Sequence, residues 1–347
     1  MINLPEYIEF SADPSASIGE FLKKNQPDAV AILVDENTRK NCLTLLDFPE
    51  FQIIEIESGE ANKTLETCQL IWEKLTTGGF SRKSLLINLG GGVIGDMGGF
   101  VASTYKRGIP FINVPTTLLS QVDASIGGKQ GVDFHGLKNH IGVFREPNKV
   151  IIHSPFLKTL PFDQLRSGFA EVLKHGLIWD KKYFQKTSTL SDINGQDWLE
   201  IIQRSVEIKQ EIVEQDPLES GLRKILNFGH TLGHAVETWH LSEGHPILHG
   251  EAIAIGMIME AYLSRKLELI SESQFTMIMD TCLKFFGHIS SVPRSEQLIP
   301  LLMQDKKNSA GKINYSLIDN IGHCKYDVTV SISLMTEAID HYRKLDE

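Results

Sequence analysis

Ser84-Leu85-Leu86-Ile87-Asn88-Leu89 runs directly into Gly90-Gly91-Gly92-Val93-Ile94-Gly95-Asp96, and this stretch decides the predicted fold. The apolar run predicts a buried parallel strand, and the glycines that follow match G-x-G-x-x-G at the start of an expected helix. Such glycines let backbone N–H groups approach a pyrophosphate at the helix N-terminus. The stretch therefore predicts an α/β fold whose glycine loop either binds a nucleotide or forms only a tight packing turn.

The loop departs from the usual dinucleotide fingerprint. In that fingerprint an acidic residue about 20 positions further on holds the ribose, whereas here Asn113-Val114-Pro115-Thr116-Thr117 occupies that place. Asp35 follows the apolar run 29–34 and closes a strand at the same sheet edge, so it is the better ribose partner. Its alternative role is that of a turn residue. The sequence thus indicates a Rossmann-like variant rather than the standard form.

The chain of 347 residues is longer than a single hydrophobic core usually grows, so we expect two domains. Over residues 1–160, branched apolar runs alternate with helix-length segments, which predicts an α/β domain on a parallel sheet. Over residues 161–347 helical periodicities take over, which predicts a mainly α-helical domain. The expected strands are 29–34, 51–56, 84–89, 110–114 and 149–152, the expected helices are 60–75, 164–179, 197–215, 222–240, 249–267 and 273–286, and a hairpin is expected over 312–325.

Composition excludes several classes of protein. The chain has 41% hydrophobic and 22% charged residues and no stretch near the roughly 18 unbroken apolar residues of a membrane span, so we expect no membrane role. The beginning of the sequence lacks a secretory pattern, which predicts a cytoplasmic protein. A net charge of -10 disfavours nucleic acid as a partner but allows an anionic small molecule where Lys and Arg gather. The four cysteines form no C-x-x-C pair and are expected to be reduced core thiols.

Histidines and one carboxylate suggest a metal site. His230 and His234 are four residues apart, so they share one face of a predicted helix. His249 opens the next helix, and Glu171 lies among apolar residues, where an unpaired carboxylate would be costly to bury. Zinc accepts these ligands, and three protein ligands with one open position are typical of a catalytic zinc site. The alternative is a buried helix whose histidines hydrogen-bond locally, and the cluster as a whole favours the metal.

Several motifs occur in order along both halves of the chain. They are Gly90 to Asp96, Pro115-Thr116-Thr117-Leu118-Leu119, Gln121 to Lys129, Leu137-Lys138-Asn139, Asn227-Phe228-Gly229-His230 and His249-Gly250-Glu251. Together they resemble the 3-dehydroquinate synthase family of the sugar-phosphate cyclases. The similarity spans roughly residues 30–325.

The resemblance implies an N-terminal NAD-binding domain and a C-terminal domain that holds zinc, with Co2+ as a substitute. The implied metal ligands are Glu171, His230 and His249, and His234 then belongs to the catalytic machinery rather than to the metal. The other implied catalytic residues are Lys129, Lys174 and Asn139, and Lys129, Asn139 and Lys306 are the candidates to orient phosphate. The implied substrate contacts are Arg107, Lys209, Arg223, Asn227 and Lys306, and the implied NAD contacts are Asp35, Asn37, Glu60, Lys63, Gly91, Gly92, Val93, Asp96, Thr116, Thr117, Asp123, Lys138 and Asn139.

The implied activity is that of a lyase. It converts 3-deoxy-D-arabino-heptulosonate 7-phosphate to 3-dehydroquinate and phosphate, the second step of the shikimate pathway towards chorismate and the aromatic amino acids. NAD is transiently reduced, phosphate leaves by β-elimination, the hydride returns, and ring opening and an aldol step close the carbocycle. A substrate with a carboxylate and a phosphate explains why an acidic protein would gather Lys and Arg. The resemblance also implies a homodimer, with Arg107 reaching the neighbouring subunit.

Two departures from the family's typical motifs keep alternatives open. Gly128-Lys129-Gln130 and Val132-Asp133 stand where typical members have Gly-Lys-Thr and Val-Asn. Related cyclases with inosose, valiolone or aminodehydroquinate products are therefore alternatives. A metal-dependent alcohol dehydrogenase of the glycerol dehydrogenase type, which would release NADH, is another. The last is a nucleotide-binding regulator with a structural metal.

Overall fold

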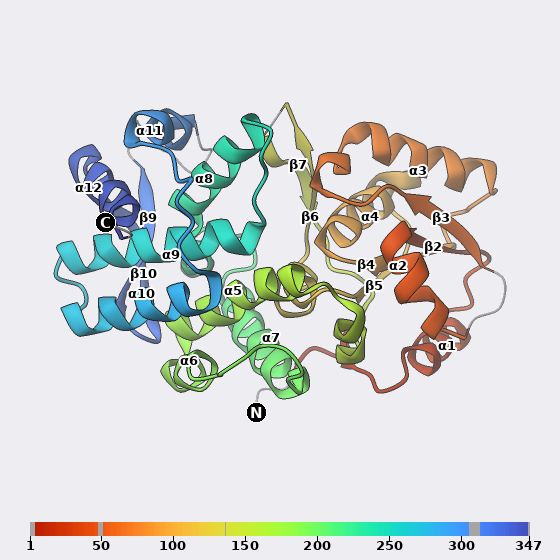
Figure 1. Cartoon of the computed structure of the whole chain (residues 1–347). Coiled ribbons are helices and arrows are strands. Elements are labelled where there is room, and N and C mark those ends of the chain that lie inside the picture. Colours follow the sequence, from red (N-terminus) through yellow and green to blue (C-terminus); the bar gives the residue numbers. More distant parts are fainter. Residues whose placement is uncertain (1–3, 48–50, 136, 305–312, 346–347) are drawn as a thin grey trace. The chain divides into compact units, whose positions relative to one another are not determined.

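The computed structural model describes residues 4–47, 51–135, 137–304 and 313–345 (Figure 1). The chain divides into two compact units, which are Met1–Pro161 with Asp197–Gln210, and Phe162–Gln196 with Glu211–Glu347. The first unit ends at Pro161, and the sequence pattern predicted a change from an α/β to a helical domain after residue 160. The segment 197–210, however, packs with the first unit, so a single cut along the sequence does not separate the two.

A six-stranded parallel sheet forms the centre of the first unit, in the order β1-β8-β5-β4-β2-β3. The inner strands β4 and β5 are buried along their whole length, as their mostly apolar runs predict. All five expected strands are present with bounds within one residue of the prediction, and β1 is an additional edge strand. The bounds are β1 Ile8–Phe10, β2 Val30–Asp35, β3 Gln52–Ile56, β4 Leu85–Gly90, β5 Phe111–Pro115 and β8 Lys149–Ile152.

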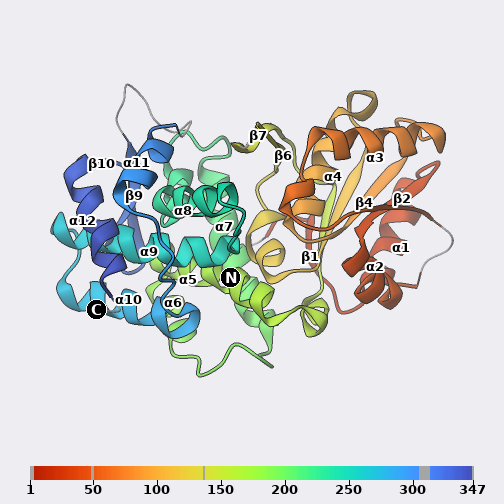
Figure 2. The ribbon, with the colours of Figure 1, turned by 45° about the horizontal axis from the view of Figure 1, so that its top comes forward.

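Side chains of the inner strands β2, β4 and β5 alternate between two cores, one on each face of the sheet. Ala31 and Leu33 of β2 belong to the core under α3 (Leu65–Thr77) and α4 (Gly92–Thr104). Ile32 and Val34 belong to the opposite core, which includes Ile18 of α1 (Pro14–Asn25). Figure 2 shows α3 and α4 on one side of the strands and α1 and α2 (Glu36–Asn41) on the other. A parallel sheet covered on both faces confirms the predicted α/β architecture.

The strand order reverses between β2 and β4. From β2 the chain adds β3 on one side and then returns to place β4 on the other. The carboxyl ends of β2 and β4 therefore flank the topological switch point, where open α/β sheets usually bind ligands. Asp35 ends β2 and Gly90 ends β4. The two features that the sequence associates with a nucleotide thus lie at adjacent strand ends.

An antiparallel hairpin of β6 (Lys129–Phe134) and β7 (Leu137–Phe144) also belongs to the first unit, and the sequence did not predict it. Its outer strand β7 is mostly exposed, so the sequence of β7 lacks the buried apolar face from which a strand is predicted. The remaining short elements of this unit are the 3-10 turns η1 Leu43–Leu45, η2 Glu60–Asn62, η3 Tyr105–Arg107 and η5 Ser154–Thr159, and the π-helical turn η4 Ser120–Ala124.

Helices dominate the second unit, as predicted. Figure 1 shows α9 (His249–Lys266) running through its middle, where it packs against α5, α8, α10 and α12. Almost every residue of α9 is buried, which is typical of a helix that is apolar on all sides. The other elements are α5 Phe162–Trp179, α6 Lys181–Ser188, α7 Trp198–Gln215, which both units share, η6 Leu222–Asn227, α8 His230–Ser242, α10 Glu272–Phe286, α11 Ser295–Gln304, β9 Asn314–Asn320, β10 His323–Thr329 and α12 Ile332–Arg343.

Two predicted helices begin or break differently in the structure. The expected helix 222–240 is wrong as one element, because it is divided into η6 and α8. The break occurs at Gly229, whose φ of 80° is left-handed, a conformation that glycine adopts without steric cost. The expected helix 60–75 begins only at Leu65, because Thr64 caps α3. The first break matters for the site, since it makes His230 the first residue of α8.

The predicted hairpin near the C-terminus is confirmed as β9 and β10, although it extends four residues further than expected, to Thr329 rather than 325. The four cysteines, Cys42, Cys68, Cys282 and Cys324, are buried and form no disulfide. Among the described helices none is long and apolar enough to cross a membrane.

Candidate functional site

Three helices of the second unit bring the predicted metal ligands together. Glu171 lies in the middle of α5, His230 begins α8 and His249 begins α9. Glu171 Oε1 is 3.5 Å from His230 Nε2 and 3.6 Å from His249 Nε2. Two atoms that each lie 2.0–2.2 Å from one zinc ion at the tetrahedral angle are about 3.3–3.6 Å apart. The two distances therefore fit edges of a coordination sphere better than hydrogen bonds.

His234 lies one turn further along α8 and faces the same point. Its ring centre is 5.0 Å from that of His230 and 5.7 Å from that of His249. One ring nitrogen from each of the three histidines lies within 4.8 Å of the others. The structure thus gathers four groups that a metal accepts, and the assignment of His234 to catalysis rather than to the metal stays a prediction.

The second nitrogen of each proposed histidine ligand faces an oxygen. His230 Nδ1 is 3.1 Å from the carbonyl oxygen of Phe228, and His249 Nδ1 is 3.5 Å from Glu237 Oε2. Metal-binding histidines usually donate their other N–H to such an acceptor, which orients the ring and fixes its tautomer. Both rings consequently turn Nε2 towards Glu171. Sequence reasoning did not find Glu237, because a glutamate on a helix carries no local signal of this contact.

The electrostatic surroundings of the two rings differ. Burial lowers the pKa of His230 well below its ordinary value, and the Lys174 ammonium acts in the same direction. Burial also disfavours the charged form of His249, but Glu237 and Glu171 outweigh it and raise the pKa of His249 to about 9. Lys174 itself forms a buried ion pair with Glu171 on α5. Neutral His230 is the form that binds a metal, and at His249 a metal must compete with a proton.

The predicted substrate residues of the second unit stand on η6, just before α8. Arg223 is 1% exposed and donates from Nη1 to the carbonyl oxygen of Pro217 at 2.6 Å. Asn227 donates from Nδ2 to Glu219 Oε1 at 2.7 Å. Glu219 is a polar neighbour that sequence reasoning missed. Lys306 lies outside the described residues.

A carboxylate holds the loop that leads into η6. Asp216 accepts hydrogen bonds from the backbone N–H groups of Ser220, Gly221 and Arg223, at 3.0, 2.7 and 3.0 Å. Burial alone would raise the pKa of Asp216, but these bonds prevail and lower it to about 2. The ionised carboxylate therefore fixes the backbone from which the Arg223 side chain extends.

The glycines of the loop in the first unit differ in how closely other residues surround them. Gly91 is the N-cap residue of α4 and supplies no side-chain acceptor to the helix. A methyl group on Gly95 would meet nothing within 4 Å, and one on Gly92 would make only an ordinary contact at 3.5 Å. By contrast, methyl groups on Gly98 and Gly99 would come within 2.0 and 1.9 Å of side chains of β4 and β6. Gly98 and Gly99 thus allow close packing against β4 and β6, whereas Gly92 and Gly95 have room beside the first turn of α4.

A small cavity adjoins this loop at the carboxyl ends of β4 and β5. The predicted contact Thr116 follows β5 and donates its backbone N–H to the carbonyl oxygen of Gly90 at 3.0 Å, which joins the two strand ends. Val93 lies half-buried in the first turn of α4, and Thr117 lies against Gly91. The lining residues are Asn88, Gly90, Gly91, Gly92, Gly95, Asn113, Pro115, Ser120, Ala124 and Ser125.

Asp35 has a local partner. Its Oδ1 accepts from the Thr38 backbone N–H at 2.7 Å and from the Thr38 hydroxyl at 2.9 Å, in a capping box at the start of α2. Asn37 is exposed on the same helix. The alternative role as a turn and cap residue is therefore confirmed, and contact with a ribose stays a prediction.

Five of the predicted NAD contacts form a connected network. The Lys63 ammonium is buried and donates to Asp96 Oδ2 at 2.7 Å and to Asn139 Oδ1 at 2.6 Å. Lys138 Nζ lies 3.6 Å from Glu60 Oε1. Burial opposes the charge on Lys63, but Asp96 and Glu60 together raise its pKa above the ordinary value. Three segments that are distant in sequence, 60–63, 96 and 138–139, thus converge around the Lys63 ammonium.

The other basic candidates of the first unit differ in burial. Lys209, on α7, is 6% exposed and lies 2.9 Å from Asp123 Oδ1 and 2.6 Å from the carbonyl oxygen of Asp123. Lys129 is exposed at the start of β6. Arg107 is exposed in η3, where Lys106 and Arg107 both have positive φ, 49° and 70°. The structure therefore pairs Lys209 with a predicted NAD contact, and it places Arg107 in a strained turn.

Asp133 is a polar residue that the sequence marked only as a departure. Its Oδ1 accepts from the Asn139 backbone N–H at 2.7 Å. The pairing of β6 with β7 is irregular here, because Val132 pairs with Ile141 and Phe134 with Leu137. Such a bulge re-aims a side chain, and Asn139, with φ of 48°, turns its amide towards Lys63.

Two family models and a curated relative place the chain in one family. Residues 53–167 match the family model described as 3-dehydroquinate synthase N-terminal, and residues 168–308 match the model described as 3-dehydroquinate synthase C-terminal. A 3-dehydroquinate synthase of Parabacteroides distasonis is 41% identical over 340 residues, which cover 96% of each chain.

Solved structures of two cyclases resemble the whole chain. A 2-deoxy-scyllo-inosose synthase complexed with carbaglucose-6-phosphate, NAD+ and Co2+ has a TM-score of 0.85 at 25% identity and covers 96% of each chain. The 2-epi-5-epi-valiolone synthase ValA from Streptomyces hygroscopicus, with NAD+ and Zn2+ bound, has a TM-score of 0.83 at 25% identity and covers 99% of this chain and 98% of its own.

Proposed function

Because the chain belongs to the 3-dehydroquinate synthase family, we propose that it converts 3-deoxy-D-arabino-heptulosonate 7-phosphate to 3-dehydroquinate and inorganic phosphate, as a lyase. The observation that carries the proposal is the approach of Glu171 Oε1 to both His230 and His249 at coordination distances. NAD+ with Co2+ or Zn2+ in two similar cyclases supports NAD and a divalent metal as the cofactors.

The residues present fit such a metal. Glu171, His230 and His249 would hold it, since a carboxylate and two imidazoles with oriented second nitrogens are a suitable donor set. When bound, the metal supplies polarisation of a substrate hydroxyl, and NAD supplies a reversible acceptor of hydride. His234, beside the proposed ligands on α8, would accept the proton of that hydroxyl. Lys174, paired with Glu171, would hold a positive charge next to the reacting end of the substrate.

The anionic groups of the substrate require cations. Each carboxylate or phosphate gains most from charge-assisted hydrogen bonds where the donors are shielded from water. Arg223 and Lys209 are such buried donors, and Asn227 offers an amide on the same turn as Arg223. Lys129, Asn139 and Lys306 are proposed to orient the phosphate, and Arg107 is proposed to serve the neighbouring subunit of a homodimer.

For NAD, the proposed cradle is the switch point of the first unit. The N–H groups of Gly91, Gly92 and Val93 would receive the pyrophosphate, and Asp35 would hold the ribose. The Lys63 network would hold Asn139 and Asp96 in place. The remaining proposed contacts are Asn37, Glu60, Thr116, Thr117, Asp123 and Lys138. A cytoplasmic location completes the proposal.

The experiment supplies the heptulosonate phosphate with catalytic NAD and zinc and measures phosphate and NADH together. Phosphate release over many turnovers without accumulated NADH is the expected result, because the hydride returns in each cycle. NADH formed in proportion to product would instead identify a dehydrogenase. A parallel reaction with a hexose 6-phosphate separates the related cyclases, since one of them is solved with carbaglucose-6-phosphate. Turnover of the hexose phosphate alone would refute the proposed substrate.

A further inference from the structure

The start of α8 receives its cap from a different helix. Its N-cap residue is Gly229, which has no side chain to offer. Glu260 of α9 is fully buried, and its carboxylate accepts from the backbone N–H groups of Gly229 at 2.6 Å and Leu232 at 3.0 Å. The first N–H groups of a helix need acceptors, and a negative charge at that end is favourable. Glu260 therefore replaces the missing cap.

One peptide unit connects this cap to His230. The carbonyl of Phe228 and the N–H of Gly229 belong to the same planar trans peptide, so they point in opposite directions. Glu260 holds the N–H on one side, and on the other side the carbonyl accepts from His230 Nδ1 at 3.1 Å. Fixing one side of the peptide fixes the other. The direction of His230 Nε2 therefore depends on Glu260.

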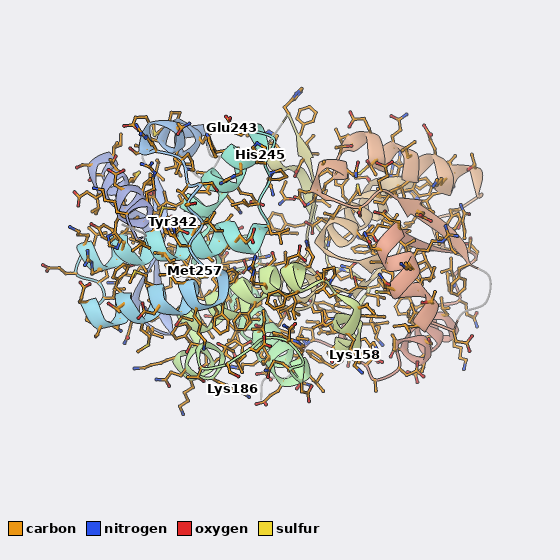
Figure 3. The ribbon with its side chains drawn as sticks, in the orientation of Figure 1. Lys158, Lys186, Glu243, His245, Met257 and Tyr342 are labelled. Atoms are coloured by element: carbon orange, nitrogen blue, oxygen red, sulfur yellow. The ribbon has the colours of Figure 1, made fainter. Side chains whose placement is uncertain are left out.

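Close packing between α8 and α9 limits which other acceptors could reach the Gly229 N–H. A methyl group on Gly256 of α9 would lie 1.9 Å from the Gly229 carbonyl oxygen, and one on Gly229 would lie 2.7 Å from Met257 Cγ. Figure 3 labels Met257 on α9. The backbone at the start of α8 thus rests directly on α9, where a lost carboxylate is not simply replaced by solvent.

A second hydrogen bond connects the start of α9 to α5. Ser167 Oγ accepts from the Gly250 backbone N–H at 2.9 Å. A methyl group on Gly250 would lie 2.0 Å from the Ser167 carbonyl oxygen, so these helices also touch through their backbones. Ser167 precedes Glu171 by one helical turn and shares its face of α5. The same face therefore carries one proposed ligand and positions the next, His249.

We propose that Glu260 and Ser167 are positioning residues of the metal centre, which hold His230 and His249 in the geometry that binds the ion. This inference rests on the proposed function. Each residue caps the helix that begins with a ligand, α8 for Glu260 and α9 for Ser167. Ligands held ready by such outer contacts bind a metal more tightly than ligands that must be ordered on binding.

The test measures zinc affinity of the metal-free full chain by competition with a chelator, and the absorption spectrum of the Co2+ form. Glu260→Ala is expected to lower zinc affinity about 10- to 100-fold. Glu260→Gln keeps one acceptor oxygen but sets an NH2 against a backbone N–H, so a smaller loss is expected. Ser167→Ala removes a single hydrogen bond and should lower affinity least. All three should alter the Co2+ spectrum, because the ligand field changes.

The matched control is Ser331→Ala, which removes the N-cap of α12 in the same unit, where Ser331 Oγ accepts from Leu334 N–H at 3.3 Å. It should lower the thermal midpoint and leave zinc affinity and the Co2+ spectrum unchanged. Parental affinity and spectrum in both Glu260 variants, with zinc lost from Glu171→Gln, would overturn the positioning role and leave the proposed function intact. Equal zinc binding by the parent and Glu171→Gln would overturn the metal site itself. If Glu260→Ala does not fold, the Gln and Ser167 variants decide the matter.

Discussion

Replacing Gly229 by alanine probes the contact between α8 and α9 most directly. The new methyl group would lie 2.7 Å from Met257 Cγ, 3.1 Å from the Ile253 carbonyl oxygen and 3.2 Å from the Met257 nitrogen. A left-handed backbone costs an L-residue about 1–2 kcal/mol. Overpacking costs about 1–3 kcal/mol more. We therefore expect Gly229→Ala to lower the free energy of unfolding by about 2–5 kcal/mol.

Gly195 offers a matched control in the same unit. Its φ of 67° is also left-handed, but a methyl group there would meet nothing within 4 Å. Gly195→Ala should therefore lose only the backbone contribution, about 1–2 kcal/mol. The difference between the two variants isolates the crowding against α9.

Equilibrium urea unfolding of both variants beside the parent measures this difference, with refolding checked for reversibility. A larger shift of the midpoint for Gly229→Ala at unchanged slope is expected. Zinc affinity should fall as well, because the displaced peptide carries the acceptor of His230 Nδ1. Equal midpoint shifts for the two variants would refute the reasoning, since they would show that the methyl group fits without moving α9.

Three further predictions concern single carboxylates and one imidazole. Glu171→Gln should lose zinc and activity together, whereas His234→Ala should lose activity but retain zinc in elemental analysis. Zinc retained by Glu171→Gln and lost from His234→Ala would reverse the assignment of the ligands. Asp216→Asn should destabilise the protein by about 1–3 kcal/mol at pH 7, since charged acceptors hold backbone N–H groups more strongly. Because the pKa of Asp216 in the folded protein, about 2, lies below the ordinary 3.8, this stability is present above about pH 4 and is lost as the pH falls towards 2. The urea midpoints of parent and variant should therefore converge near pH 2. A difference between the midpoints that stays constant with pH would contradict the explanation. Asp133→Ala should weaken NAD binding about fivefold in calorimetry, because it loses one hydrogen bond that orients Asn139. Asp133→Asn keeps the acceptor oxygen and should bind NAD as the parent does. Equal NAD binding by the two variants would show that this hydrogen bond does not orient Asn139.

Strand and helix positions could be predicted where the pattern is local. The run 84–89 is apolar at nearly every position, and β4 is buried along its whole length. Hydrophobic periodicity is carried by neighbouring residues, so it survives without knowledge of the fold. It failed at Gly229, because the helical spacing continues through the break and an isolated glycine inside such a pattern is tolerated. It also missed the hairpin 129–144, whose outer strand is mostly exposed.

By itself the sequence determined which chemical groups are available, and it associated Glu171, His230 and His249 with one site, since residue types and motif order are carried by the chain. Tertiary structure alone decided that Glu171 Oε1 lies within 3.6 Å of both imidazoles. It also decided that Lys63 donates to Asn139, 76 residues away, and that Glu260 caps a helix that begins 30 residues before it. Such distances depend on how helices and strands pack, and packing is a property of the whole fold that no local pattern encodes.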